Sequence, residues 1–118
     1  MPPSLRLALI LSACAVLLAL AGCVGMYPDR LIARQDHAGL ALHYAHEARE
    51  LNEKAHEWET LAKLYEKHPD VNAKAETAQF AERCRTIARH LRQAAEEAET
   101  LAAAHQQTLS KNASDPRP

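Results

Sequence analysis

The stretch Lys67-His68-Pro69-Asp70-Val71-Asn72, or KHPDVN, is the one strong interruption in a long run of helix-forming residues. Proline cannot continue a helix and disfavours helical geometry at the residue before it, while Asp70 or Asn72 can cap the helix that follows. The sequence on either side is rich in good helix formers, chiefly Ala, Glu, Leu, Arg, Lys and Gln. The break therefore predicts two helices, about 31–67 and 72–109, with the second folded antiparallel onto the first.

Apolar residues recur at alternating steps of three and four along both predicted helices, the spacing of a coiled-coil seam. In the first helix they are Ala41, Tyr44, Ala48, Leu51, Ala55, Trp58, Ala62 and Tyr65; in the second they are Phe80, Cys84, Ile87, Leu91, Ala94, Ala98 and Leu101, followed by His105 and Thr108. The predicted fold class is all-α, an antiparallel two-helix coiled-coil hairpin. Because a two-helix hairpin buries little apolar surface, we expect it to dimerise to a four-helix bundle or to dock on a partner.

Side-chain volume distinguishes two registers of the hairpin, because interdigitated packing sets a large residue opposite a small one. The preferred register sets Ala62 near Phe80 and Ala55 near Ile87, whereas a half-heptad slip sets Ala55 near Phe80. A second stripe, of small residues, runs beside the seam and either permits close backbone approach or leaves a groove for a further helix: Ala81, Ala88, Ala95 and Ala102, with Ala38 and Ala45 on the first helix.

The chain begins with one early cation, Arg6, and an apolar run over 7–21 that ends in small residues. This run is shorter than the roughly 20 apolar residues of a membrane-spanning helix. A basic start, a short apolar middle and small residues at its end are typical of a cleaved secretory signal. Residues 1–22 are therefore predicted to be a signal peptide.

The end of that run, Leu20-Ala21-Gly22-Cys23, resembles the lipobox of bacterial lipoproteins. The resemblance implies cleavage between Gly22 and Cys23 by the lipoprotein signal peptidase, a diacylglycerol on the Cys23 thiol and an acyl chain on the new amino group. Val24 stands where an aspartate would retain such proteins in the inner membrane, so the resemblance also implies the periplasmic face of the outer membrane. The alternative is an ordinary signal peptide cut near Gly22, with Cys23 a free thiol.

The rest of the chain divides into three parts. Residues 23–30 are predicted to be the lipidated cysteine and a short tether, 31–110 the helical hairpin, and 111–118, which are polar with two prolines, a disordered tail. Within the first helix Gly39 is a weak point, and Asp36 could cap its stable part.

Seven histidines in 118 residues invite a metal-binding hypothesis, since imidazole and carboxylate ligands suit zinc, copper or nickel. His43 and His46 lie at helical spacing with Glu47 and Glu50, although the seam places these histidines toward solvent. The residues do not form an HExxH motif. A solvated polar face is the other interpretation of this cluster.

His37 and His105 both fall on the seam, and the preferred register brings them face to face. Such a pair could bind metal, close the bundle as a polar layer, or loosen that end of the hairpin on protonation. Cys84 is the one thiol left once Cys14 and Cys23 are accounted for, so no intramolecular disulfide is predicted. On the seam it should behave as a small buried hydrophobe.

The near balance of charge, formally −1, provides no broad cationic field for nucleic acid. Nothing in the sequence resembles a nucleophile with its base, a phosphate-binding loop or a dinucleotide turn. The local basic patch is expected to be compensated across the hairpin by Glu47, Glu50 and Glu53; it consists of Arg83, Arg85, Arg89 and Arg92.

Residues 36–107 also resemble small, uncharacterised Ala/His-rich helical proteins of the bacterial envelope, a resemblance that implies no activity. The sequence thus predicts a non-enzymatic structural or partner-binding lipoprotein without a cofactor beyond its lipid. Its partner is expected to be another copy or an envelope protein. The alternative is a periplasmic metal-handling lipoprotein that uses some of six residues: His37, His43, His46, Cys84, His90 and His105.

Overall fold

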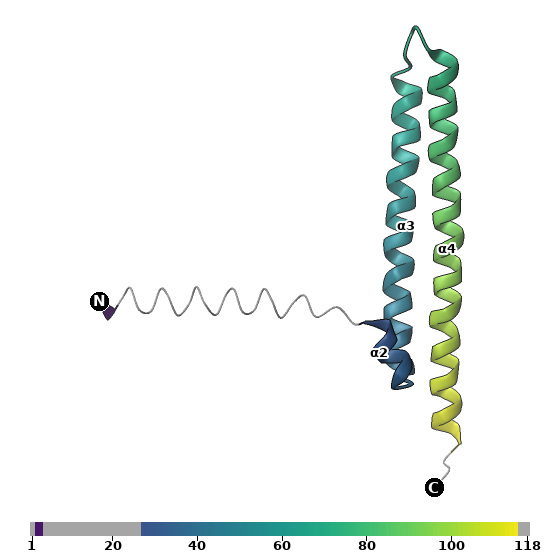
Figure 1. Ribbon diagram of the computed structural model, residues 1–118. Coiled ribbons are helices and arrows are strands. Elements are labelled where there is room, and N and C mark those ends of the chain that lie inside the picture. Colours follow the sequence, from purple (N-terminus) through teal and green to yellow (C-terminus); the bar gives the residue numbers. More distant parts are fainter. Residues whose placement is uncertain (1, 4–26, 116–118) are drawn as a thin grey trace.

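The computed structural model describes residues 2–3 and 27–115 of the chain. Its elements are α2 (Pro28–Ala33), α3 (His37–Lys67) and α4 (Lys74–Ser114), and the described residues contain no strand. Helices α3 and α4 lie side by side and antiparallel, while α2 lies beside the first turns of α3 at the open end of the hairpin (Figure 1). The all-α antiparallel hairpin predicted from the sequence is confirmed.

Helix α3 begins where Asp36 can cap it. The Asp36 carboxylate Oδ1 accepts a hydrogen bond from the backbone N–H of Gly39 at 2.8 Å. Such a bond satisfies one of the free N–H groups of the first helical turn. The predicted N-cap is confirmed, and the start of the first long helix moves from about residue 31 to His37.

The short helix α2 was not expected, because residues 23–30 were predicted to be a tether. Pro28 occupies the first turn of α2, where its fixed φ suits a helix and its missing N–H is no loss. The chain then turns back at Gln35, which has a positive φ of 53°. The predicted boundary between tether and hairpin is therefore wrong at 28–30.

Gly39 is the point at which α2 packs onto α3. A Cβ atom at Gly39 would lie 2.8 Å from Leu31 Cδ2 and 2.8 Å from Asp36 Oδ2. The absence of a side chain thus allows both the cap and the contact with α2. The glycine expected to weaken the helix is a docking position.

The connection after α3 is closed by a side chain that the sequence interpretation overlooked. The buried Thr77 hydroxyl accepts a hydrogen bond from Asp70 N at 3.2 Å and donates one to Ala73 O at 2.9 Å. Asp70 Oδ1 accepts from Asn72 N at 2.8 Å, inside the turn. The second helix therefore begins at Lys74 rather than 72, and its N-cap residue, Ala73, provides no side-chain cap.

At its far end α4 continues to Ser114, so 111–114 of the predicted disordered tail are helical. The sequence has no proline or glycine between Lys74 and Pro116. The Ser114 hydroxyl donates to Ser110 O at 2.9 Å, and Asp115 N donates to Lys111 O at 3.1 Å. The predicted end at 109 is therefore too early.

The core of the hairpin is a line of small side chains, here called the alanine seam. Each member is at most 2% exposed, and members recur every seven residues on both helices: Ala41, Ala48, Ala55 and Ala62 on α3, and Ala81, Ala88 and Ala95 on α4. Ala62, Ala81 and Cys84 form one cluster, against which Trp58 packs. Leu40, at 3% exposed, is the largest buried hydrophobic side chain among the described residues, and Cys84 and Ala98 are 6% and 8% exposed.

Every second predicted seam position of α4 therefore lies one residue too early, whereas Cys84 and Ala98 are buried as predicted. Tyr65 of α3, also predicted on the seam, is 40% exposed. Phe80, Ile87 and Leu101 were assigned to the core, yet they are 48%, 37% and 45% exposed. The expected large-opposite-small pairs, such as Ala62 with Phe80, are wrong. Alanine against alanine lets the two backbones approach closely along their whole length, and the dispersion contacts accumulate.

The predicted register itself is confirmed. His37 Nδ1 and His105 Nδ1 lie 2.8 Å apart, as the preferred register requires. The half-heptad slip would separate these residues by a full turn or more of helix. This contact fixes which residues of α3 and α4 are level along the hairpin.

Candidate functional site

A row of four aromatic rings occupies the open end of the hairpin. The ring of Tyr44 stacks on His105, with centroids 5.7 Å apart and an interplanar angle of 11°, and His43 meets Tyr44 edge-on at 5.2 Å. The centroids of His37 and His105 are 5.1 Å apart. The direct contact of two Nδ1 atoms requires one ring to donate and the other to accept. At least one of the two imidazoles is therefore neutral in this arrangement.

The other three candidate metal ligands lie apart from that row, and His90 is exposed on α4. His46 is exposed on α3, where its Nε2 atom lies 3.1 Å from Glu50 Oε1. Cys84 is 6% exposed inside the apolar cluster, which confirms the prediction of a buried thiol. Among the residues that the structure describes, no three His, Cys, Asp or Glu side chains are placed to hold one metal ion. The metal hypothesis is left with the His37 and His105 pair.

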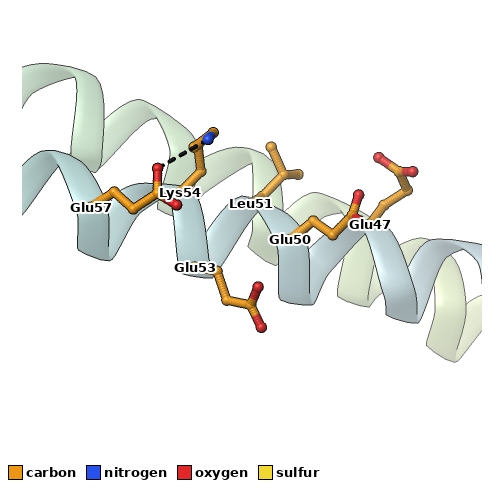
Figure 2. A pocket seen from close by; sticks show the side chains of 6 residues that line it. All are labelled: Glu47, Glu50, Leu51, Glu53, Lys54 and Glu57. Atoms are coloured by element: carbon orange, nitrogen blue, oxygen red, sulfur yellow. Dashed lines mark hydrogen bonds and ion pairs between the residues drawn. The ribbon is translucent and has the colours of Figure 1, made fainter.

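The outward face of α3 carries an open hollow rich in carboxylates (Figure 2). Lys54 Nζ lies 2.9 Å from Glu57 Oε2, so one carboxylate is paired within the hollow. Glu53 points away from that pair (Figure 2). The acidic groups therefore spread over the surface rather than converging on one point; the lining residues are Glu47, Glu50, Leu51, Glu53, Lys54 and Glu57.

One edge of the hairpin, here called the charged flank, is held by ion pairs between α3 and α4. Arg92 donates from Nη2 and Nε to Glu59 Oε1 at 2.8 and 3.1 Å, and Arg85 pairs with Glu66. The hydrogen bond from Arg92 is the main cause that lowers the pKa of the Glu59 carboxyl below its ordinary value. Partial desolvation opposes this shift, and the positive charges of Arg92 and two nearby side chains reinforce it.

The expected partners of these arginines were Glu47, Glu50 and Glu53, and that expectation is wrong for Arg85 and Arg92. Arg85 and Arg92 lie on one side of the alanine seam of α4. Glu59 and Glu66 lie on the same side of the hairpin on α3, so they face these arginines. Arg89 pairs within α4, with Glu82. Arg83 has no ion-pair partner in the described part of the chain.

The opposite edge carries exposed hydrophobic side chains and is here called the apolar flank. The rings of Tyr65 and Phe80 meet at 5.7 Å, so the two helices contribute to one surface. Its members are each 37% to 48% exposed: Leu61, Leu64 and Tyr65 on α3, and Phe80, Ile87 and Leu101 on α4. Exposed hydrophobic side chains gathered along one edge are typical of interaction sites.

The sequence interpretation missed the α4 part of this surface because two heptad stripes lie one residue apart. Phe80, Ile87 and Leu101 are larger, so volume alone favoured them for the core. The signal that could have corrected the choice is the recurrence of alanine every seven residues on both helices. Matching small stripes are what two closely packed helices require.

No helix among the described residues is both long and apolar enough to cross a membrane. The predicted signal peptide and the lipobox, with Gly22 and Cys23, lie outside the described residues. Comparison with known proteins identifies no relative: no protein family, no curated protein and no solved structure matches the chain.

Proposed function

We propose that this chain is a lipoprotein anchored through Cys23 to the periplasmic face of the outer membrane. Its hairpin is a non-enzymatic structural or partner-binding module of the cell envelope. Support for the anchor comes from the sequence Leu20-Ala21-Gly22-Cys23 and the short apolar run that precedes it. Two or three acyl chains on one cysteine give durable attachment, which a single chain does not.

The position of the hairpin relative to Cys23 suits a tethered module. Only residues 24–27 separate Cys23 from Pro28, and a chain of that length reaches at most about 18 Å. Helix α2 therefore stays near the lipid, at the open end of the hairpin (Figure 1). The connection between α3 and α4 is the far end, about 46 Å away along the 31 residues of α3.

The observation that carries a partner-binding role is the apolar flank. Phe80 is 48% exposed and Leu64 is 47% exposed, although burying such side chains is favourable. They lie near the connection, away from the tether, where another protein can reach them. The exposed ion pairs of the hairpin, by contrast, contribute little binding energy by themselves.

Replacement of the predicted lipidation site tests the anchor. Cys23→Ser should abolish incorporation of labelled palmitate and release the chain from the membrane fraction while its helical circular dichroism remains. Cys84→Ser is the matched control and should retain the label, because that thiol is buried in the hairpin. A Cys23→Ser chain that still carries palmitate and sediments with membranes would contradict the proposal.

A further inference from the structure

We propose that the apolar flank binds a second copy of this chain, so that two hairpins form a four-helix bundle in which α4 of each packs on α3 of the other. The proposal rests on the proposed function in one respect: two copies anchored to one membrane share the same direction. The exposed side chains Phe80, Ile87 and Leu101 recur at heptad spacing over α4. On α3 of a second copy, Leu61, Leu64 and Tyr65 provide apolar partners near the level of Phe80.

The first argument for a second copy is that the core of the hairpin consists mostly of small side chains. The buried residues of α3 and α4 are alanines, Thr77, Cys84, Gly39 and one large side chain, Leu40, while Trp58 is only partly covered and Tyr65 and Phe80 are exposed. Two-helix structures with small cores are marginal unless they associate. A second hairpin on the apolar flank would cover the large side chains that the first leaves half exposed.

Symmetry provides the second argument. A twofold axis parallel to the hairpin keeps both open ends on the same side, as a common membrane requires. The same axis places α4 of one copy beside α3 of the other. Because α3 and α4 are antiparallel within each hairpin, these new neighbours are antiparallel as well, which is the usual arrangement of a four-helix bundle.

Charge complementarity provides the third argument and distinguishes a second copy from an unrelated partner. Along α4, each residue that comes three positions after a residue on the line of the apolar flank lies on the outer edge of the same helix face. On α4 these are Arg83, His90 and Glu97, and none of the three has an ion-pair partner among the described residues. The register set by His37 and His105 determines which α3 residues are level with them.

One level pair has opposite charges, because Glu57 of α3 is level with Arg83 of α4. The other two pairs set a carboxylate level with an imidazole, which can hydrogen bond to it: Glu50 with His90, and His43 with Glu97. Within one hairpin these outer rows point away from each other, whereas the twofold axis brings each row against the other row of the second copy. Glu57 and Glu50 have exposed contacts within α3, to Lys54 and His46, but each carboxylate can accept further bonds.

The full chain in its own membrane can be tested by photo-crosslinking. p-Benzoylphenylalanine incorporated in place of Phe80 should yield an adduct of twice the chain mass, composed of two copies. The same group in place of Gln79 is the matched control and should yield none, because residue 79 points away from the hairpin. No adduct at position 80, or an adduct with a different protein, would overturn the proposal.

Charge reversal provides a second, independent measurement. In chains carrying the crosslinker at position 80, Glu57→Arg and Arg83→Glu should each lower the adduct yield about two- to fivefold, and the double variant should restore it. Failure of the double variant to recover would overturn the proposed pairing. If the chain is instead found in the soluble fraction, the lipid anchor fails, while the adduct remains measurable there and decides the dimer separately.

Discussion

Two heptad stripes of α4 lie one residue apart in sequence, and one is buried against α3 while the other is exposed. Ala81, Ala88 and Ala95 are at most 2% exposed, whereas Phe80 and Ile87 are 48% and 37% exposed. Hydrophobicity alone would place the larger residues inside. In a pair of long helices, however, close approach of the backbones rewards small residues along the line of contact, and the larger ones remain on the apolar flank.

Leucine substitutions at two adjacent alanines, one in the alanine seam and one on the apolar flank, test this difference most directly. Ala95 is 1% exposed in the alanine seam, while Ala94 is exposed on the line of the apolar flank. Ala95→Leu should lower the free energy of unfolding by up to about 3 kcal/mol, because the added atoms force the helices apart. Ala94→Leu should change it by less than about 0.5 kcal/mol or raise it.

Urea unfolding followed by circular dichroism at 222 nm measures both variants. The chain concentration is held fixed, since association would add to the apparent stability. Equal destabilisation by the two leucines would mean that Ala94 and Ala95 are packed alike, and the assignment of seam and flank would be wrong.

Two threonines allow the same comparison between a buried hydroxyl group and a hydroxyl group on the flank side. Thr77 is 6% exposed, and its hydroxyl binds both Asp70 N and Ala73 O; Thr108 lies on the flank side and bonds only to Ala104 O, within its own helix. Thr77→Val keeps the shape but leaves two backbone groups without that partner, so it should cost about 1 kcal/mol. Thr108→Val should cost less, because water can replace its bond.

Hydrogen exchange at the amides of Asp70 and neighbouring residues locates the effect. Faster exchange there in Thr77→Val, with unchanged exchange near the open end, is the expected result. Uniform loss of protection along α3 and α4 would show that Thr77 supports the whole hairpin rather than the turn.

The parts of the fold that the sequence predicts are those set by local chemistry. Pro69 ends α3, Asp36 caps it, and the three-four spacing establishes a hairpin whose register His37 and His105 confirm. The choice between two stripes one residue apart depends on the distance between the backbones. No residue of α4 specifies that distance alone, so Phe80 was placed in the core.

The same limit applies to the candidate sites. The preferred register correctly brings His37 to His105, but it does not show that Arg92 reaches Glu59 or that Arg85 reaches Glu66. These pairings depend on which flank of the hairpin each side chain lies on. That position is known only when the residues of the seam are known. Cys23 depends on no such packing, and its lipidation stays a prediction from the lipobox.

The charged flank gives the smallest expected effect. The hydrogen bond from Arg92 lowers the pKa of Glu59 in the folded chain relative to its ordinary value of 4.5. A carboxyl with a lowered folded pKa stabilises the fold above the unfolded pKa, and that stabilisation is lost as the pH falls from about 4.5 through the lowered value. Glu59→Gln removes this contribution, so its stability should decline less steeply than that of the natural chain below pH 4.5.

Thermal unfolding between pH 3 and pH 6 measures the difference. Glu53→Gln is the control, because Glu53 points away from the Lys54 and Glu57 pair (Figure 2). Added salt should shrink the difference, since the Glu59 and Arg92 pair is partly exposed and screening weakens it. If Glu59→Gln and the natural chain lose stability in parallel below pH 4.5, Arg92 does not stabilise the Glu59 carboxylate in solution. In that case the ion pair of the charged flank would not help to hold α3 against α4, and the packing of the alanine seam would be the main source of the hairpin's stability.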